Sequence, residues 1–158
     1  MKVASVKIIG CGNRHRGDDQ AGILVVERLR ELGFEADLHT GDALALIERW
    51  RSNDDVILVD AVVTGAPVGT VHVWDSNLAG SGLPNGARDA AVSSHGFDFA
   101  KAIELGRTLG KFPARLRVYG IEGRQFERGS AISRAVLAAI DSVVTQVSDG
   151  IPALLTTR

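Results

Sequence analysis

The sequence lacks the features that mark several large classes of protein. It has one cysteine, Cys11, in 158 residues, which excludes an internal disulfide and a thiolate metal cluster built by this chain alone. It also lacks an excess of charge, because 18 Lys and Arg face 19 Asp and Glu and the basic residues form no stripe. A general electrostatic attraction to nucleic acid or acidic lipid therefore has no support.

Long apolar runs are missing as well. No run reaches the length of a membrane-spanning helix, and the first ten residues, interrupted by Lys7, are too short for a secretory signal. We therefore expect a soluble, cytoplasmic protein with no nucleic-acid and no membrane partner. With 45% apolar residues, the chain can build one sizeable core, so we expect a single domain over residues 1–150 and a tail over 151–158.

The spacing of apolar residues predicts an α/β fold, a three-layer α/β/α sandwich around a twisted, mostly parallel, five-stranded sheet. The run VILV at residues 56–59 has no polar side chain, which is typical of an inner parallel strand covered on both faces. Asp42 is placed to cap the second helix. The strands are expected at residues 3–9, 35–39, 56–63, 69–74 and 115–119, and the helices at 19–32, 43–50, 96–109 and 131–147.

The stretch GCGNRHRGDD, residues 10–19, connects the first strand to the first helix, where glycine-rich turns usually bind phosphate. His15 occupies the third glycine position of a dinucleotide fingerprint, and Asp18 and Asp19 replace the Lys and Ser/Thr of a P-loop. Carboxylates at this point repel phosphate. They either satisfy the positive end of the helix as caps or bind a cation.

Two further side chains are expected at the carboxyl edge of the sheet, where ligands of parallel sheets gather. Asp60 ends the most apolar strand, so its carboxylate must bond to a loop backbone, cap a turn or face a cation. His95 follows Ser94 at the start of a helix, where a neutral imidazole can bind metal or make an ordinary hydrogen bond. We expect structural roles for His39 and His72, which lie inside strand patterns, and a packing role for Cys11.

Taken together, these blocks resemble the hydrogenase maturation endopeptidases. The resemblance rests on G-C-G-N followed by D-D-x-x-G in residues 10–22, then VILVDAV, SSHGF and G-I-E-G at residues 120–123, and it runs from about residue 6 to residue 145. It implies a monomeric peptidase that removes the C-terminal extension of a [NiFe]-hydrogenase large-subunit precursor after nickel has been inserted.

The resemblance also implies roles for individual residues. The metal ligands and catalytic residues would be Asp19, Asp60 and His95, with nickel carried by the precursor and with zinc or cadmium as other possible occupants. Gly12, Asn13 and Gly41 would contact the substrate. The family varies between Glu and Asp at the first ligand position, and this sequence has the shorter Asp.

Two departures from the family pattern concern the loops. The family often has a glycine pair after the second strand, where this chain has Thr40 and Gly41. The glycine loop also carries Arg14, His15 and Arg16, which either contact the precursor or are simply solvated.

Other functions stay open at this point. Glu35 and Asp37 lie near the second strand, where an acid would bind a ribose, so a nucleotide- or nucleoside-binding enzyme on a Rossmann-like sheet is the main alternative. A non-enzymatic binding module, in which the acids only cap, is the other. No Ser-His-Asp order, HExxH helix or activated cysteine is evident, so familiar protease motifs leave the hydrolytic step undefined.

Overall fold

The structure of the chain, a computed structural model, describes residues 6–40, 42–76 and 99–156. His95, Gly41 and most of the Gly- and Ser-containing stretch at 75–94 therefore lie outside the described residues. The elements in chain order are β1 (Val6–Cys11), the 3-10 turn η1 (Gly17–Gln20), α1 (Ala21–Glu31), β2 (Asp37–His39), α2 (Ala43–Ile47), β3 (Asp55–Val62), β4 (Val71–Asp75), α4 (Phe99–Thr108), β5 (Arg115–Glu122) and α5 (Arg134–Thr156).

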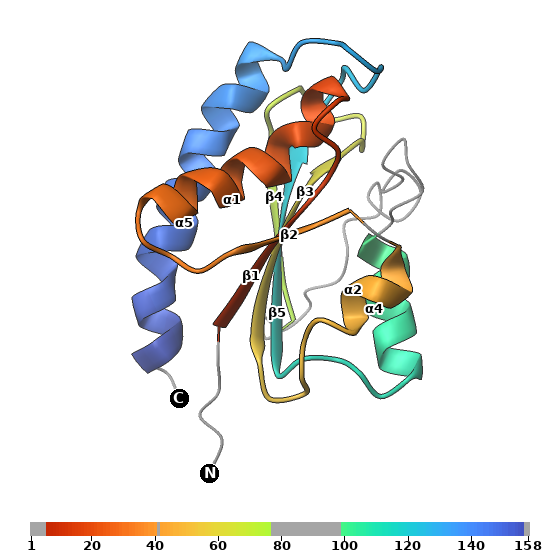
Figure 1. The fold of residues 1–158 in the computed structure, drawn as a ribbon, viewed down its shortest axis with the longest axis vertical. Helices are drawn as coiled ribbons and strands as arrows, with labels where there is room; N and C mark the ends of the chain where they lie inside the picture. The colour runs from red at the N-terminus through yellow and green to blue at the C-terminus, as the bar shows by residue number, and fades with distance from the viewer. Residues whose placement is uncertain (1–5, 41, 77–98, 157–158) are drawn as a thin grey trace.

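The five strands form one sheet in the order β2-β1-β3-β5-β4. All neighbouring pairs are parallel except β4 with β5, which is antiparallel. Helices cover both faces, with α1 and α5 on one side and α2 and α4 on the other (Figure 1). The predicted three-layer fold with a mostly parallel five-stranded sheet is confirmed.

Strand β3 lies at the centre of the sheet and is buried along its whole length. Its side chains alternate between the two cores. Ile57 and Val59 pack beneath α1 and α5, whereas Val56 and Leu58 pack beneath α2 and α4. This alternation continues past the apolar run, so Asp60 projects to the face that α2 and α4 cover.

The helices begin close to the predicted positions, but two of them end elsewhere, because α2 ends at Ile47 instead of residue 50 and α5 ends at Thr156 instead of residue 147. Asp42 caps α2 as expected, since its Oδ1 accepts a hydrogen bond from Ala45 N at 2.8 Å. Helix α5, however, continues to Thr156 and includes most of the segment expected to be a tail. Val147 and Ile151 extend its buried stripe by one more turn, and this packing outweighs the nearby Gly and Pro. The single-domain assignment itself stays a prediction.

Within the described residues, no helix combines the length and the apolarity needed to cross a membrane.

Candidate active site

The glycine turn after β1 brings two backbones into direct contact. A methyl group on Gly10 would overlap Gly22 O, and one on Gly22 would overlap Cys11 O and Val59 O. Only glycine fits at both positions, so the end of β1 lies against the first turn of α1 with no side chain between them. This close approach fixes where η1 and its two acids lie relative to the sheet.

Gly12 and Asn13 lie directly beside Asp19. Gly12 has φ +148°, and a side chain on it would overlap Asp19 O. Asn13 N donates a hydrogen bond to Asp19 O at 3.2 Å. The backbone of the turn is therefore closed back on η1, and two predicted substrate-contacting residues adjoin one predicted metal ligand.

Asp19 is a buried carboxylate, 1% exposed. Burial raises its pKa from 3.8 to about 6, against the opposing effects of the Arg16 charge and of a hydrogen bond from the Asn13 backbone. At neutral pH the folded protein thus holds a negative charge that its surroundings disfavour. A cation bound beside Asp19 would relieve that cost.

Asp60 lies at the same place in the sheet as Cys11. Gly10 pairs with Val59, so the next residues of β1 and β3, Cys11 and Asp60, are level with each other. Asp60 is 2% exposed, and its Oδ1 accepts a hydrogen bond from Ala61 N at 2.9 Å. Ala61 belongs to β3, which continues two residues past Asp60, so this bond joins the carboxylate to the backbone of its own strand and not to a loop. That Asp60 also faces a cation stays a prediction.

The charges of Asp19 and Asp60 both affect the pKa of the Cys11 thiol. Burial is the main reason that its pKa lies well above the usual value, and the charges of Asp60 and Asp19 raise that pKa further, whereas Arg49 lowers it. The two carboxylates therefore lie within electrostatic reach of one buried side chain. Cys11 itself is packed in the core beneath α2 and α4, as predicted.

The described residues fit part of a metal centre. Two buried carboxylates from separate elements supply hard oxygen donors and negative charge, which suit a divalent cation. In residues 6–40, 42–76 and 99–156, no three His, Cys, Asp or Glu side chains are grouped closely enough to hold an ion. A full ligand set would need a donor from outside these ranges, where His95 lies, or from the bound substrate.

Asp18 behaves differently from its neighbour, and its capping role is not observed. The structure shows no side-chain cap on η1. Instead, the buried carboxylate accepts hydrogen bonds from Arg124 N (2.7 Å), Gln125 N (2.9 Å), Ser133 N (2.7 Å) and Ser133 Oγ (2.8 Å). Asp18 thus ties η1 to the loop between β5 and α5. Its partners lie more than 100 residues away, so no local pattern could have indicated this role.

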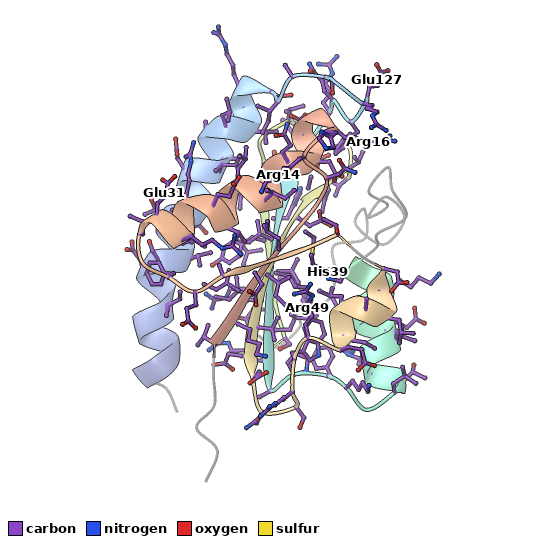
Figure 2. All side chains as sticks on the ribbon, in the orientation of Figure 1. Arg14, Arg16, Glu31, His39, Arg49 and Glu127 are labelled. Carbon is purple, nitrogen blue, oxygen red and sulfur yellow. The ribbon has the colours of Figure 1, made fainter. Side chains whose placement is uncertain are left out.

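His39 and Arg49 form a pair at the end of β2 (Figure 2). His39 Nδ1 accepts a hydrogen bond from Arg49 Nε at 2.8 Å, and Nε2 lies 3.1 Å from Asp42 O. These contacts assign the proton of a neutral ring to Nε2. His39 has the structural role expected of it. Arg49, which the sequence did not single out, is the cation whose charge reaches Cys11.

The basic loop residues are partly engaged within the protein. Arg14 Nη1 lies 3.0 Å from Glu27 Oε1 in an exposed ion pair, and His15 O accepts a hydrogen bond from Gly129 N at 2.8 Å. Figure 2 shows Arg16 at the same end of the view as Glu127, which belongs to the loop preceding α5, whereas Arg14 lies over α1. Contact of these residues with a precursor stays a prediction.

The geometry does not favour the nucleotide alternative. A ribose-binding acid lies at the carboxyl end of the second strand, but here that position is His39. Glu35 and Asp37 lie instead where β2 begins, and they line a cavity of about 550 Å³ with the first residues of β1. Their carboxylates are thus on the wrong side of β2 for that role.

Asp19→Asn is expected to stabilise the metal-free protein at pH 8 and to leave its stability unchanged near pH 3. Because folding raises the pKa of Asp19 from 3.8 to about 6, the free-energy cost of its charge develops between these pH values and is complete above them. Asn carries no charge and escapes this cost. We expect a gain of about 1–2 kcal/mol at pH 8, reduced by solvent screening, in urea unfolding. A gain that is larger at pH 3 would contradict the shift.

Comparisons with known proteins agree with this architecture. A family model described as hydrogenase maturation protease matches residues 25–149, which include Asp60 but not the glycine turn. The hydrogenase expression/formation protein HupD of Thiocapsa roseopersicina is 27% identical over 123 residues, covering 74% of this chain and 53% of that protein. The chain thus spans about half the length of this relative.

Solved structures give the same fold. The hydrogenase maturating endopeptidase HybD from E. coli is 22% identical with a TM-score of 0.74, and the match covers 94% of this chain and 93% of that one. The [NiFe] hydrogenase maturation protease HybD from Thermococcus kodakarensis is 20% identical with a TM-score of 0.64, covering 92% and 97%.

Proposed function

Because this chain belongs to the hydrogenase maturation protease family, we propose that it is an endopeptidase that removes the C-terminal extension from the large-subunit precursor of a [NiFe] hydrogenase. The observation that carries the proposal is the pair of buried carboxylates, Asp19 and Asp60, at the carboxyl edge of the sheet beside the glycine turn. In phosphate-binding loops at this position, backbone N–H groups bind the anion. Here the glycine turn lets the backbone approach the site closely, and the carboxylates of Asp19 and Asp60 supply negative charge for a cation.

Nickel is the feature of the precursor that this site would recognise. Asp19 and Asp60, with His95 as the proposed third donor, would bind a nickel ion already seated in the precursor. Two carboxylates and an imidazole leave positions on a divalent ion for ligands from the substrate. Zinc or cadmium could bind the same donors. When bound, the ion can polarise the scissile carbonyl or lower the pKa of a water.

The neighbouring backbone would position the peptide. Gly12 and Asn13 adjoin Asp19, so a chain that binds at Asp19 would pass along this turn. We propose that these residues and Gly41 contact the extension. The partner would be the precursor alone, with the enzyme acting as a cytoplasmic monomer.

Nickel-loaded precursor is expected to be cleaved and nickel-free precursor to stay intact when each is incubated with the wild-type protein. The reason is that the carboxylate pair binds the precursor through its metal. Release of the extension is followed by mass spectrometry. The Asp19→Asn variant is assayed in the same way, and Asp37→Asn, which changes an exposed acid at the beginning of β2, is its matched control. Equal cleavage of both precursors would contradict nickel recognition, and cleavage of neither would contradict the proposed function.

A further inference from the structure

A second polar cluster lies farther along the carboxyl edge of the sheet. The Glu122 carboxylate, 2% exposed at the end of β5, accepts hydrogen bonds from Thr64 N at 2.8 Å and Thr64 Oγ1 at 2.6 Å. His72 Nε2 on β4 lies 3.0 Å from Glu122 Oε1. The segment after β3 and strand β4 thus both contact one buried carboxylate of β5, and the family comparison assigns none of these residues a role.

The cluster fixes the protonation of the imidazole. An ionised carboxylate can only accept hydrogen bonds, so the proton of the His72 ring is assigned to Nε2, which donates to Glu122. The other nitrogen, Nδ1, then carries a lone pair. Within the described part of the chain, Nδ1 makes no hydrogen bond, and the His72 side chain is 23% exposed. This is the arrangement of an imidazole that a carboxylate orients to take up a proton.

His72 and Asp60 occupy one row across the sheet. Gly120 on β5 pairs with Asp60 on β3 on one side and with His72 on β4 on the other. Leu58 and Trp74, each two residues away along its strand, both pack in the core beneath α2 and α4. Asp60 and His72 therefore project to the same face, two strand spacings or about 10 Å apart.

The side chain of Val62 lies over Gly120, the residue of β5 that separates Asp60 from His72 in this row. A Cβ on Gly120 would lie 3.0 Å from Val62 Cγ1, so Val62 packs over the glycine. The imidazole of His72 and the carboxylate of Asp60 are thus separated by the side chain of Val62 and by two strand spacings. Val62 is buried, so a peptide bound at Asp60 and extending toward β4 would have to cross over the Val62 side chain to bring its scissile bond within reach of both groups.

We propose that His72 is the general base of the hydrolysis, an inference that rests on the function proposed above. His72 Nδ1 takes a proton from water while the water oxygen bonds to the scissile carbonyl carbon. The C–N bond then breaks, and the same proton passes from Nδ1 to the leaving nitrogen. Glu122 keeps its hydrogen bond to Nε2–H throughout and stabilises the transient imidazolium, while Thr64 holds the carboxylate.

The test compares wild type, His72→Ala and His72→Gln on nickel-loaded precursor. General bases contribute roughly 10²–10⁴-fold, so we expect kcat to fall by about that factor in both variants while KM changes little. Gln can still donate to Glu122 and keeps the fold if the smaller Ala does not. Added imidazole is expected to restore cleavage by His72→Ala in a saturable manner and to leave the low activity of Asp60→Asn unchanged.

Each outcome decides the proposal. A fall in kcat with imidazole rescue of His72→Ala supports it; if that variant does not fold, an equal fall in folded His72→Gln does. Wild-type kcat in either variant, or a loss that imidazole does not restore in folded His72→Ala, overturns it and leaves the proposed function intact. If the wild-type protein cleaves no precursor, the proposed function fails and the role of His72 fails with it.

Discussion

Asp60→Asn is expected to lower cleavage of nickel-loaded precursor by about a thousandfold while the protein stays folded. Metal-ion interactions supply several kcal/mol to a hydrolytic transition state, and each 1.36 kcal/mol is a factor of ten in rate. The amide keeps an oxygen that can accept the hydrogen bond from Ala61 N, so this part of β3 is preserved. Its oxygen is a far weaker ligand than a carboxylate. The measurement is kcat/KM for release of the extension.

The matched control is Asp55→Asn. Asp55 is also buried and also lies on β3, but it begins the strand, at the opposite edge of the sheet from the site. We expect its variant to retain wild-type kcat/KM even where its unfolding free energy changes. Cleavage by Asp60→Asn at the level of Asp55→Asn would remove Asp60 from the site.

Asp18→Ala is expected to lower the free energy of unfolding by about 3–5 kcal/mol, the range for breaking a buried charged network. The substitution leaves the backbone donors of Arg124, Gln125 and Ser133 without the carboxylate that satisfies them. Each unsatisfied buried donor costs about 1–3 kcal/mol unless water replaces its partner. Typical domains have only about 5–15 kcal/mol in all, so this loss is a large share. Urea unfolding monitored by circular dichroism measures it.

Two milder variants separate the contributions. Ser133→Ala removes only the hydroxyl donor and is expected to cost about 1 kcal/mol. Asp18→Asn keeps one acceptor oxygen, so its loss of unfolding free energy is expected to lie between those of Ser133→Ala and Asp18→Ala. A loss in Asp18→Ala no greater than that in Ser133→Ala would show that the carboxylate does not hold the loop.

Much of the architecture follows from local patterns. The apolar run at 56–59 predicted the central strand because a strand buried on both faces cannot carry polar side chains. The glycine-rich stretch at residues 10–19 indicated the connection from β1 into α1, and Asp42 indicated the start of α2. These features depend on a few neighbouring residues, which is why the sequence shows them.

The roles of single polar residues were harder to predict. Asp18 and Asp19 are adjacent and identical in type, yet one carboxylate bonds to a distant loop and the other lies beside the glycine turn. Only the direction of each side chain in η1 distinguishes them. The contact between His72 and Glu122 likewise depends on the antiparallel register of β4, which strand patterns do not specify. Long-range pairing decides such roles, and a single sequence carries little information about it.

The hydrogen bonds of Asp18 determine when, during synthesis of the chain, η1 can be fixed in place. Its partners lie at residues 124–133, so η1 cannot be held in place until these residues have left the ribosome. A nascent chain that ends before residue 124 already contains the glycine turn, Asp19 and Asp60. It still lacks the loop residues whose hydrogen bonds to Asp18 hold η1. Competence to bind a cation would therefore emerge only after β5 and the segment that follows it have been made.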